Sequence, residues 1–440
     1  MSCREVETNG MKKNVVQTVS VQLVSFLVSV LLNLFLPKYI DEYEYSYWQT
    51  FLLYASYVPL LHFGFLDGLM LRYSQYDYGS LNKPLVRSQF KIFILSEIVL
   101  ALIGFAFAQT VSGLTKIILS FVSLNVVVLN LYTYTSYLFQ LTNRISNYAI
   151  QVLILRMTLG VGIVLVVFLG SSRFYQICVV YFIAHLIAII WGWLNNQGLF
   201  LGPSLSVRES FSEMKENVTA GATLLFANLS AMLLVGGAKL FVQWNCDALV
   251  FGQVAFSFNV LNLFLTFVTA ASIAIFPSLK RIKKDDLPNF YIKTRNSITP
   301  FLFLALLLYF PGYYILNLWL PNYSTSLVYL GIVMPILLFS ARVSLLTNNY
   351  LKAYRKEKKM LVINAFSVLL AFGLFALAIL YFESICLLLL CLVVVIVLHS
   401  IVSEITVMKM IHRKKYGTFI LELSIIAAYV AIVMKFNGLF

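Results

Sequence analysis

The sequence is poor in charge and in the residues that usually carry catalysis. Only 11% of its 440 residues are charged, and it holds four histidines and five cysteines. The cysteines form no Cys-x-x-Cys pair and have no histidine cluster beside them, so we expect small apolar residues rather than disulfides or metal ligands. A phosphate-binding loop, a catalytic triad and metal-ligand spacing are also missing. The absence of these motifs argues against most enzyme classes, and we expect neither a metal nor a cofactor.

Apolar sequence is what the chain has in excess: 60% of its residues are hydrophobic. It falls into thirteen runs, each near or above the roughly 20 residues that a helix needs to cross a bilayer core. The runs are continuously apolar and do not alternate, which predicts helices rather than a barrel. The predicted spans are 15–36, 47–70, 90–109, 117–139, 149–169, 175–195, 217–240, 248–276, 297–317, 325–347, 361–381, 385–408 and 418–436.

Positive charge falls on alternate breaks between these runs. Of the 32 lysines and arginines, 25 lie in breaks on one side and three on the other, counting the N-terminus with the first group. This asymmetry predicts a cytoplasmic N-terminus in a multi-pass protein. The net charge of +14 then reflects orientation and attraction to anionic lipid, so we expect no nucleic-acid partner.

The breaks are too short to hold a soluble domain, so all function must lie between the helices. The longest predicted inside break, 196–216, separates six spans from six further spans and a thirteenth. We therefore expect an all-α polytopic membrane protein with about 12 transmembrane helices in two six-helix lobes around a central cavity. The predicted parts are a lobe at 1–195, a cytoplasmic loop at 196–216, a lobe at 217–408, and a basic loop with an additional helix at 409–440.

Charged residues inside spans are candidates for function because burying charge in a membrane is costly. Arg156, Lys239 and Arg342 are cations within runs. They either bind an anionic cargo or extend to the headgroups. Glu97 and His185 are candidates for ion coupling, since a proton-coupled transporter needs a titratable group within the membrane. Otherwise each pairs with a buried arginine or hydrogen-bonds a neighbouring helix.

The order and spacing of several segments resemble polysaccharide-biosynthesis flippases of the Wzx type, in the superfamily that includes the MATE exporters and the lipid II flippase MurJ. The chain departs from that family at His62 and Ala238, where members usually carry acids, so the resemblance implies no coupling acid there. The segments are Leu36-Pro37-Lys38-Tyr39, Tyr43-Glu44-Tyr45-Ser46, His62-Phe63-Gly64-Phe65, Leu71-Arg72-Tyr73, Gly237-Ala238-Lys239-Leu240, Ile275-Phe276-Pro277, Lys280-Arg281, Leu318-Trp319-Leu320-Pro321-Asn322-Tyr323 and Leu351-Lys352-Ala353-Tyr354-Arg355.

The resemblance implies a transporter of the bacterial inner membrane, not an enzyme. Its cargo would be undecaprenyl-pyrophosphate-linked oligosaccharide for O-antigen, capsule or exopolysaccharide, moved to the outer leaflet by alternating access. Polysaccharide polymerase or ligase machinery would be a partner, besides membrane lipid. We expect Arg72, Arg156 and Arg342 to bind the pyrophosphate, with Lys239 on its outward path.

Three other functions remain open at this point. A MATE-like small-molecule or cation antiporter would need a coupling acid, for which Glu97 is the candidate. A teichoic-acid or lipid II-type flippase differs only in its cargo. A membrane-embedded glycan polymerase or ligase is the enzyme alternative, and the small outer loops argue against it.

Overall fold

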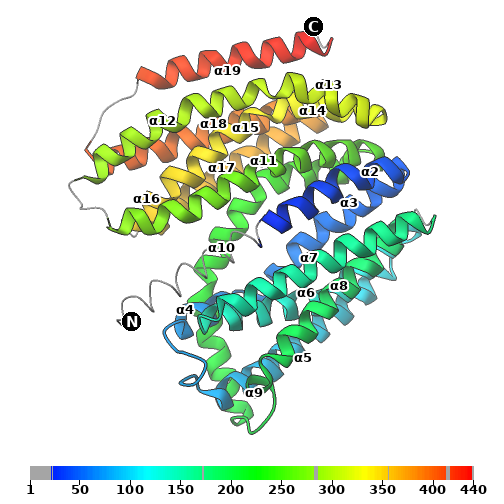
Figure 1. Cartoon of the computed structure of the whole chain (residues 1–440), viewed down its shortest axis with the longest axis vertical. Coiled ribbons are helices and arrows are strands. Elements are labelled where there is room, and N and C mark those ends of the chain that lie inside the picture. The colour runs from blue at the N-terminus through cyan, green and yellow to red at the C-terminus, as the bar shows by residue number, and fades with distance from the viewer. Residues whose placement is uncertain are drawn as a thin grey trace, which may run out of the picture. The chain divides into compact units, whose positions relative to one another are not determined.

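The computed structural model describes residues 21 and 23–438, apart from 171–172, 282–285, 355 and 413–416. For 267–281, 357, 417 and 418, it describes the backbone only. Every regular element within the described residues is a helix (Figure 1). In chain order they are η1 (Leu31–Phe35), α2 (Leu36–Tyr39), α3 (Glu42–Tyr57), η2 (Val58–His62), α4 (Phe65–Tyr73), α5 (Lys83–Ala108), α6 (Gly113–Leu141), α7 (Ile145–Phe168), α8 (Phe174–Leu194), α9 (Gln197–Phe200), α10 (Val207–Asn245), α11 (Ala248–Arg281), α12 (Leu287–Leu307), α13 (Tyr309–Trp319), η3 (Pro321–Tyr323), α14 (Ser324–Val333), α15 (Pro335–Arg342), η4 (Val343–Thr347), α16 (Asn348–Ala353), α17 (Glu357–Leu380), α18 (Ile385–Met410) and α19 (Gly417–Phe436).

The prediction of an all-helical, multi-pass membrane protein is confirmed. Ten helices in the described part of the chain are long and apolar enough to cross a membrane. Two bent pairs, Glu42–His62 with Phe65–Tyr73 and Pro321–Val333 with Pro335–Ala353, raise the number to as many as twelve if each pair is one span. The first predicted span, 15–36, lies partly outside the described residues, and a shorter apolar helix, Leu23–Tyr39, is described there.

Several helices extend beyond the apolar runs that predicted them. Helix α5 begins at Lys83 rather than at 90, because Asn82 caps it by accepting a hydrogen bond from the Leu85 backbone amide (3.3 Å). Helix α12 begins at Leu287 rather than at 297. The helical backbone satisfies its own hydrogen bonds and continues past the apolar core of the membrane. Arg295, which we predicted to lie in a break, is therefore part of a helix.

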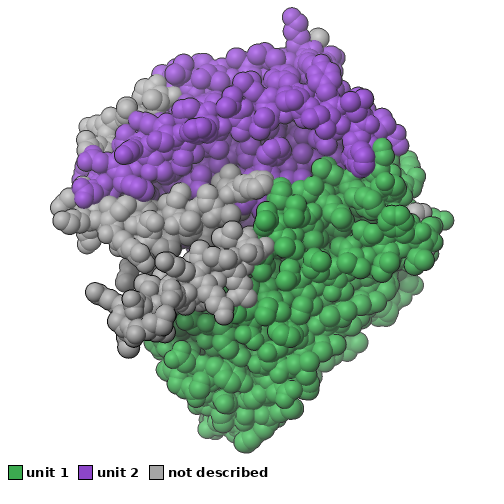
Figure 2. Space-filling model, in the orientation of Figure 1, with its two compact units in different colours: residues 1–226 green, residues 227–440 purple. Residues whose placement is uncertain are grey.

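The chain divides into two compact units, residues 1–226 and 227–440 (Figure 2). The division falls within α10, which begins inside the segment predicted as an inter-lobe loop. In unit 1, α5 packs on α6, and α7 and α8 pack on each other. In unit 2, α17 packs on α18, α11 on α14, and the C-terminal helix α19 on α14. The predicted six-helix lobes stay predictions.

The second span of unit 1 is bent by 54° between η2 and α4. Phe63 and Gly64 adopt positive φ angles of 48° and 82° at this point. Helix α4 then meets the beginning of α10 at glycines: a Cβ on Gly68 would lie 1.8 Å from the Asn217 carbonyl oxygen, and one on Gly221 would lie 2.0 Å from the Gly64 carbonyl oxygen. Only glycine permits so close an approach of the two backbones. This contact sets α4 against the polar start of α10.

Candidate functional site

Arg156 lies at the middle of α7, eleven residues after Ile145 and twelve before Phe168. At 1.5 Å per residue it is about 16 Å from the helix start, deeper than the apolar run predicts because α7 begins four residues earlier. The side chain is half-buried. Its Nε is buried without a hydrogen-bond partner, and within the described residues no carboxylate lies at ion-pair distance. A half-buried guanidinium with an unpartnered Nε has a donor left for an anionic group.

The residues around Arg156 are aromatic and polar. Tyr132 of α6, and Tyr181 and His185 of α8, are close enough to interact with its charge. The imidazole of His185 lies edge-on to the Tyr132 ring at 5.3 Å, and its Nδ1 lies 2.8 Å from the Tyr181 carbonyl oxygen. Tyr148 of α7 completes the group. The structure therefore brings together Arg156 and His185, two of the residues that we singled out separately.

Lys239 is the corresponding cation of unit 2. It lies in α10, six residues before Asn245, and its Nζ is 5.2 Å from the centroid of the Phe258 ring of α11. No ion pair of Lys239 is found in the described part of the chain. A lysine on an aromatic face keeps its positive charge available to a further anionic group. Arg156 and Lys239 thus share the property of lacking a carboxylate partner.

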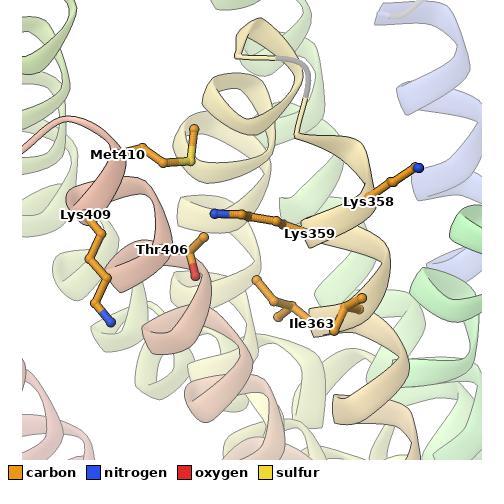
Figure 3. Close-up of a pocket in the computed structure, with 7 residues that line it drawn as sticks. Lys358, Lys359, Ile363, Thr406, Lys409 and Met410 are labelled. Carbon is orange, nitrogen blue, oxygen red and sulfur yellow. The ribbon is translucent and has the colours of Figure 1, made fainter.

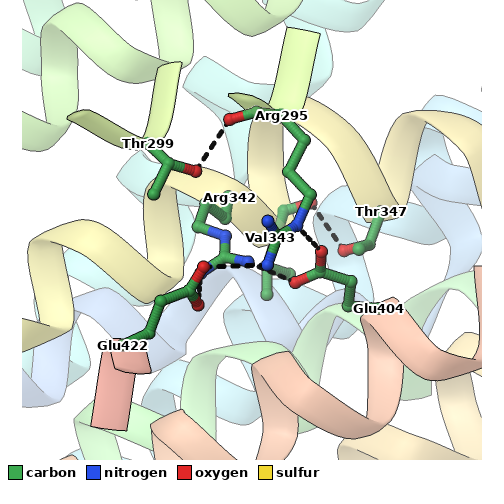
Figure 4. A network of polar contacts seen from close by, with 7 residues as sticks. All are labelled: Arg295, Thr299, Arg342, Val343, Thr347, Glu404 and Glu422. Carbon is green, nitrogen blue, oxygen red and sulfur yellow. Dashed lines mark hydrogen bonds and ion pairs between the residues drawn. The ribbon is translucent and has the colours of Figure 1, made fainter. Parts of the chain in front are cut away.

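Arg342 is in a different situation, because two glutamates neutralise it. Its Nη1 donates to Glu422 Oε2 (2.6 Å) and its Nη2 to Glu404 Oε2. Arg295 contacts the same two carboxylates, with its Nη2 2.8 Å from Glu422 Oε1. The four side chains point at one another from α12, α15, α18 and α19, and all are at least 93% buried (Figure 4). We call Arg295, Arg342, Glu404 and Glu422 the charge tetrad; its use as a substrate site stays a prediction.

Arg342 is the one member of the charge tetrad among the site residues predicted from the sequence. Arg295 stands two residues before the predicted ninth span, so we counted it among the cations of a break. Glu422 is a carboxylate near the start of the thirteenth run, and its position in an apolar stretch was a signal that could have found it. Their pairing could not be read from spacing, since Arg295 and Glu422 are 127 positions apart.

Arg72 lies at the end of α4, where the glycine contact holds α4 against α10. Its Nη1 donates to Asn217 Oδ1 (2.7 Å), and its Nη2 lies 2.7 Å from Glu216 Oε2 and 3.0 Å from Glu213 Oε2. The side chain is 28% exposed and lines a cavity of about 550 Å³ in unit 1, together with Lys215. Its glutamate partners are themselves partly exposed, so these ion pairs are weaker than those of a buried tetrad.

Glu97 is the candidate coupling acid and is almost fully buried in α5. Its Oε2 accepts a hydrogen bond from Asn130 Nδ2 (2.6 Å), and the same amide lies 3.4 Å from the Val58 carbonyl oxygen, where η2 begins in the bent span. None of the described cations lies within ion-pair distance of Glu97. An acid that is buried with one amide partner can exchange a proton or a cation.

The described residues contain no cluster of His, Cys, Asp or Glu that could hold a metal ion. The described cysteines, Cys178, Cys246, Cys386 and Cys391, are free thiols, and Cys3 lies outside the described residues. His399 of α18 contacts Asn364 Oδ1 through Nε2 (2.8 Å).

No family model matches the sequence, and no curated protein matches it significantly. Solved structures match along nearly the whole chain. The lipid II flippase MurJ in an inward closed conformation has a TM-score of 0.68 at 12% identity, covering 96% of this chain and 97% of that one. An inward-facing multidrug resistance MATE family transporter of the MOP superfamily has a TM-score of 0.66 at 9% identity, covering 90% and 98%.

An outward-facing MATE family transporter of the same superfamily gives a TM-score of 0.53 at 12% identity, covering 91% of this chain and 96% of that one. At sequence identities this low, the structural similarity shows the fold alone and leaves the cargo undetermined. The protein is a multi-pass membrane protein with the helical transporter fold of MurJ and of MATE transporters of the MOP superfamily.

Proposed function

We propose that this protein is a Wzx-type flippase of the bacterial inner membrane. It moves undecaprenyl-pyrophosphate-linked oligosaccharide repeat units of O-antigen, capsule or exopolysaccharide from the cytoplasmic to the outer leaflet by alternating access. In this proposal the N-terminus is cytoplasmic, as the charge asymmetry indicates. The observation that carries the proposal is Arg156, a cation at the middle of a span with no carboxylate partner among the described residues.

The cargo has three chemical parts, and two of them have a match in the chain. A pyrophosphate requires cations, and the planar fork of an arginine donates two parallel hydrogen bonds to phosphate oxygens. Sugar rings stack on aromatic faces and bond hydroxyls, which Tyr132, Tyr148 and Tyr181 supply around Arg156. The polyprenyl tail needs no protein site, because it can remain in the bilayer.

The four candidate cations differ in how easily a pyrophosphate could replace their existing ion-pair partners. A pyrophosphate can compete for Arg72, because Glu213 and Glu216 are partly exposed. It could reach Arg342 only by displacing a buried carboxylate and leaving it uncompensated, which is strongly unfavourable. We therefore propose Arg156 as the main pyrophosphate ligand, Arg72 as an early contact at the inner side, and Lys239 as a contact near the outer side.

Substitution of Arg156 tests this proposal in cells whose surface glycan depends on the protein. Arg156→Ala should abolish glycan display while the protein remains in the membrane, and Arg156→Lys should retain part of the display because it keeps the charge. Lys116→Ala removes an exposed cation near the start of α6 in the same unit and serves as the matched control. Full display by the Arg156→Ala protein would overturn the proposal.

A MATE-like small-molecule antiporter is the second candidate, and Glu97 is the observation that favours it. The buried carboxylate lacks a cation partner in the described part of the chain, as a site for a coupling ion requires. Loss of drug resistance on Glu97→Gln, with glycan display intact, would favour the antiporter. A lipid II or teichoic-acid flippase would have the same pyrophosphate or phosphate requirement at Arg156, so isolation of the lipid-linked cargo that accumulates in deletion cells distinguishes these flippases.

A further inference from the structure

A basic cavity opens between the start of α17 and the end of α18 in unit 2. Its volume is about 560 Å³, and it is lined by Lys358, Lys359, Val362, Ile363, Thr406, Lys409 and Met410. The helices are neighbours that pack along each other. Since both are long enough to span a membrane, the cavity lies at the level where the spans end. It involves none of the residues of the proposed transport site.

The cavity gathers positive charge, and the described side chains place no counter-charge in it. Within the described residues, none of its three lysines forms an ion pair and no carboxylate lines the cavity. Lys359 points from α17 toward α18, whereas Lys358 points away from it (Figure 3). Lys358 and Lys359 also lie in the first turn of α17, where the helix dipole already makes the potential positive. An anion in this cavity would be stabilised by both sources of potential.

Two exposed apolar stripes continue from the cavity along the helices. On α17, Val362, Phe366 and Leu369 follow at helical spacing, with 67–73% of each residue exposed. On α18, the stripe of Val394, Leu398 and Val402 leads to Thr406 at intervals of four residues. Exposed apolar faces of a spanning helix contact acyl chains. The site thus combines an anion-binding head region with a surface for hydrocarbon.

We propose that this cavity binds the headgroup of an anionic phospholipid of the bilayer. The lipid phosphate would contact Lys359 and Lys409, while its acyl chains lie along the two stripes. Basic pockets between spanning helices are suited to anionic lipid headgroups for these reasons. A free phosphate shares the charge but not the acyl chains, so the stripes favour the lipid. The proposal depends on the membrane-spanning helices and not on the identity of the transported cargo.

Lipid binding to the purified full-length protein tests the proposal. Native mass spectrometry and thermal unfolding would be measured with phosphatidylglycerol, phosphatidylcholine and inorganic phosphate as separate probes. The double variant Lys359→Gln/Lys409→Gln should bind phosphatidylglycerol about tenfold to thirtyfold more weakly than the wild type. Phosphatidylcholine and inorganic phosphate should give no comparable shift in Tm.

The matched control is Lys352→Gln/Lys356→Gln, which removes the same charge from exposed lysines just before α17 that do not line the cavity. It should bind phosphatidylglycerol like the wild type. Equal losses in the two variants would mean that overall basic charge attracts the lipid, and would overturn the cavity site. Unchanged binding by Lys359→Gln/Lys409→Gln, or displacement of the lipid by millimolar inorganic phosphate, would overturn it as well. All four lysines are exposed, so the variants should fold, and Tm without lipid checks this.

Discussion

Arg342 Nη1 of α15 and Glu422 Oε2 of α19 lie 2.6 Å apart, although the two residues are 80 positions apart in the chain. The pair belongs to the charge tetrad, in which two arginines and two glutamates are balanced inside unit 2. The contact makes the C-terminal helix an integral part of that unit rather than an appendage. It also pairs Arg342 with two carboxylates.

Removing Glu422 should destabilise the protein strongly. Glu422→Gln leaves two buried arginines with one carboxylate, and breaking a buried pair costs about 3–5 kcal/mol. We expect a clear fall in the Tm of the purified protein. The double variant Glu422→Gln/Arg295→Met restores charge balance and should recover part of the loss. A Tm unchanged by Glu422→Gln would show that the tetrad does not hold α19.

The contact between α4 and α10 should be intolerant of any side chain. Gly221→Ala would place a Cβ 2.0 Å from the Gly64 carbonyl oxygen, so the two backbones must separate. We expect a cost of at least about 1–3 kcal/mol, measured by thermal unfolding. Gly79→Ala is the control, because nothing lies within 4 Å of its added Cβ. Equal stability of the two variants would contradict the close approach.

Glu97→Gln should separate a coupling role from a structural one. The substituted amide can still accept the hydrogen bond from Asn130, so the Tm should change little. The side chain can no longer bind or release a proton. If Glu97 couples transport to protons, the variant should lose the dependence of transport on a pH gradient. A variant that transports with the wild-type dependence on the gradient would exclude Glu97 as the coupling residue.

Much of the fold could be predicted from the sequence, because the bilayer imposes a length and a polarity on each span. The runs located the helices, whose ends differ at Lys83 and Leu287, where the helix continues beyond the apolar core. The bend at Phe63 and Gly64 was not predicted, since the apolar run continues through it. An apolar run indicates that a segment lies in lipid, but it does not indicate where the helix axis bends.

The candidate site was less predictable, for a physical reason. A charge inside a run marks a costly position, but its role depends on which remote side chain faces it. Arg156 and Arg342 are equivalent in the sequence, and the structure separates them: one lacks a carboxylate partner among the described residues and the other has two. Such pairing is set by helix packing, which a single sequence does not specify.

We propose that Arg156 binds the pyrophosphate of a lipid-linked oligosaccharide during its translocation. The most direct test of this proposal is the flipping of undecaprenyl-pyrophosphate-linked oligosaccharide in proteoliposomes that contain the wild type, Arg156→Ala or Lys116→Ala protein at equal density. We expect translocation by the wild type and Lys116→Ala proteins and none above empty liposomes by Arg156→Ala. Wild-type flipping by Arg156→Ala, or no flipping by the wild type, would contradict the proposal.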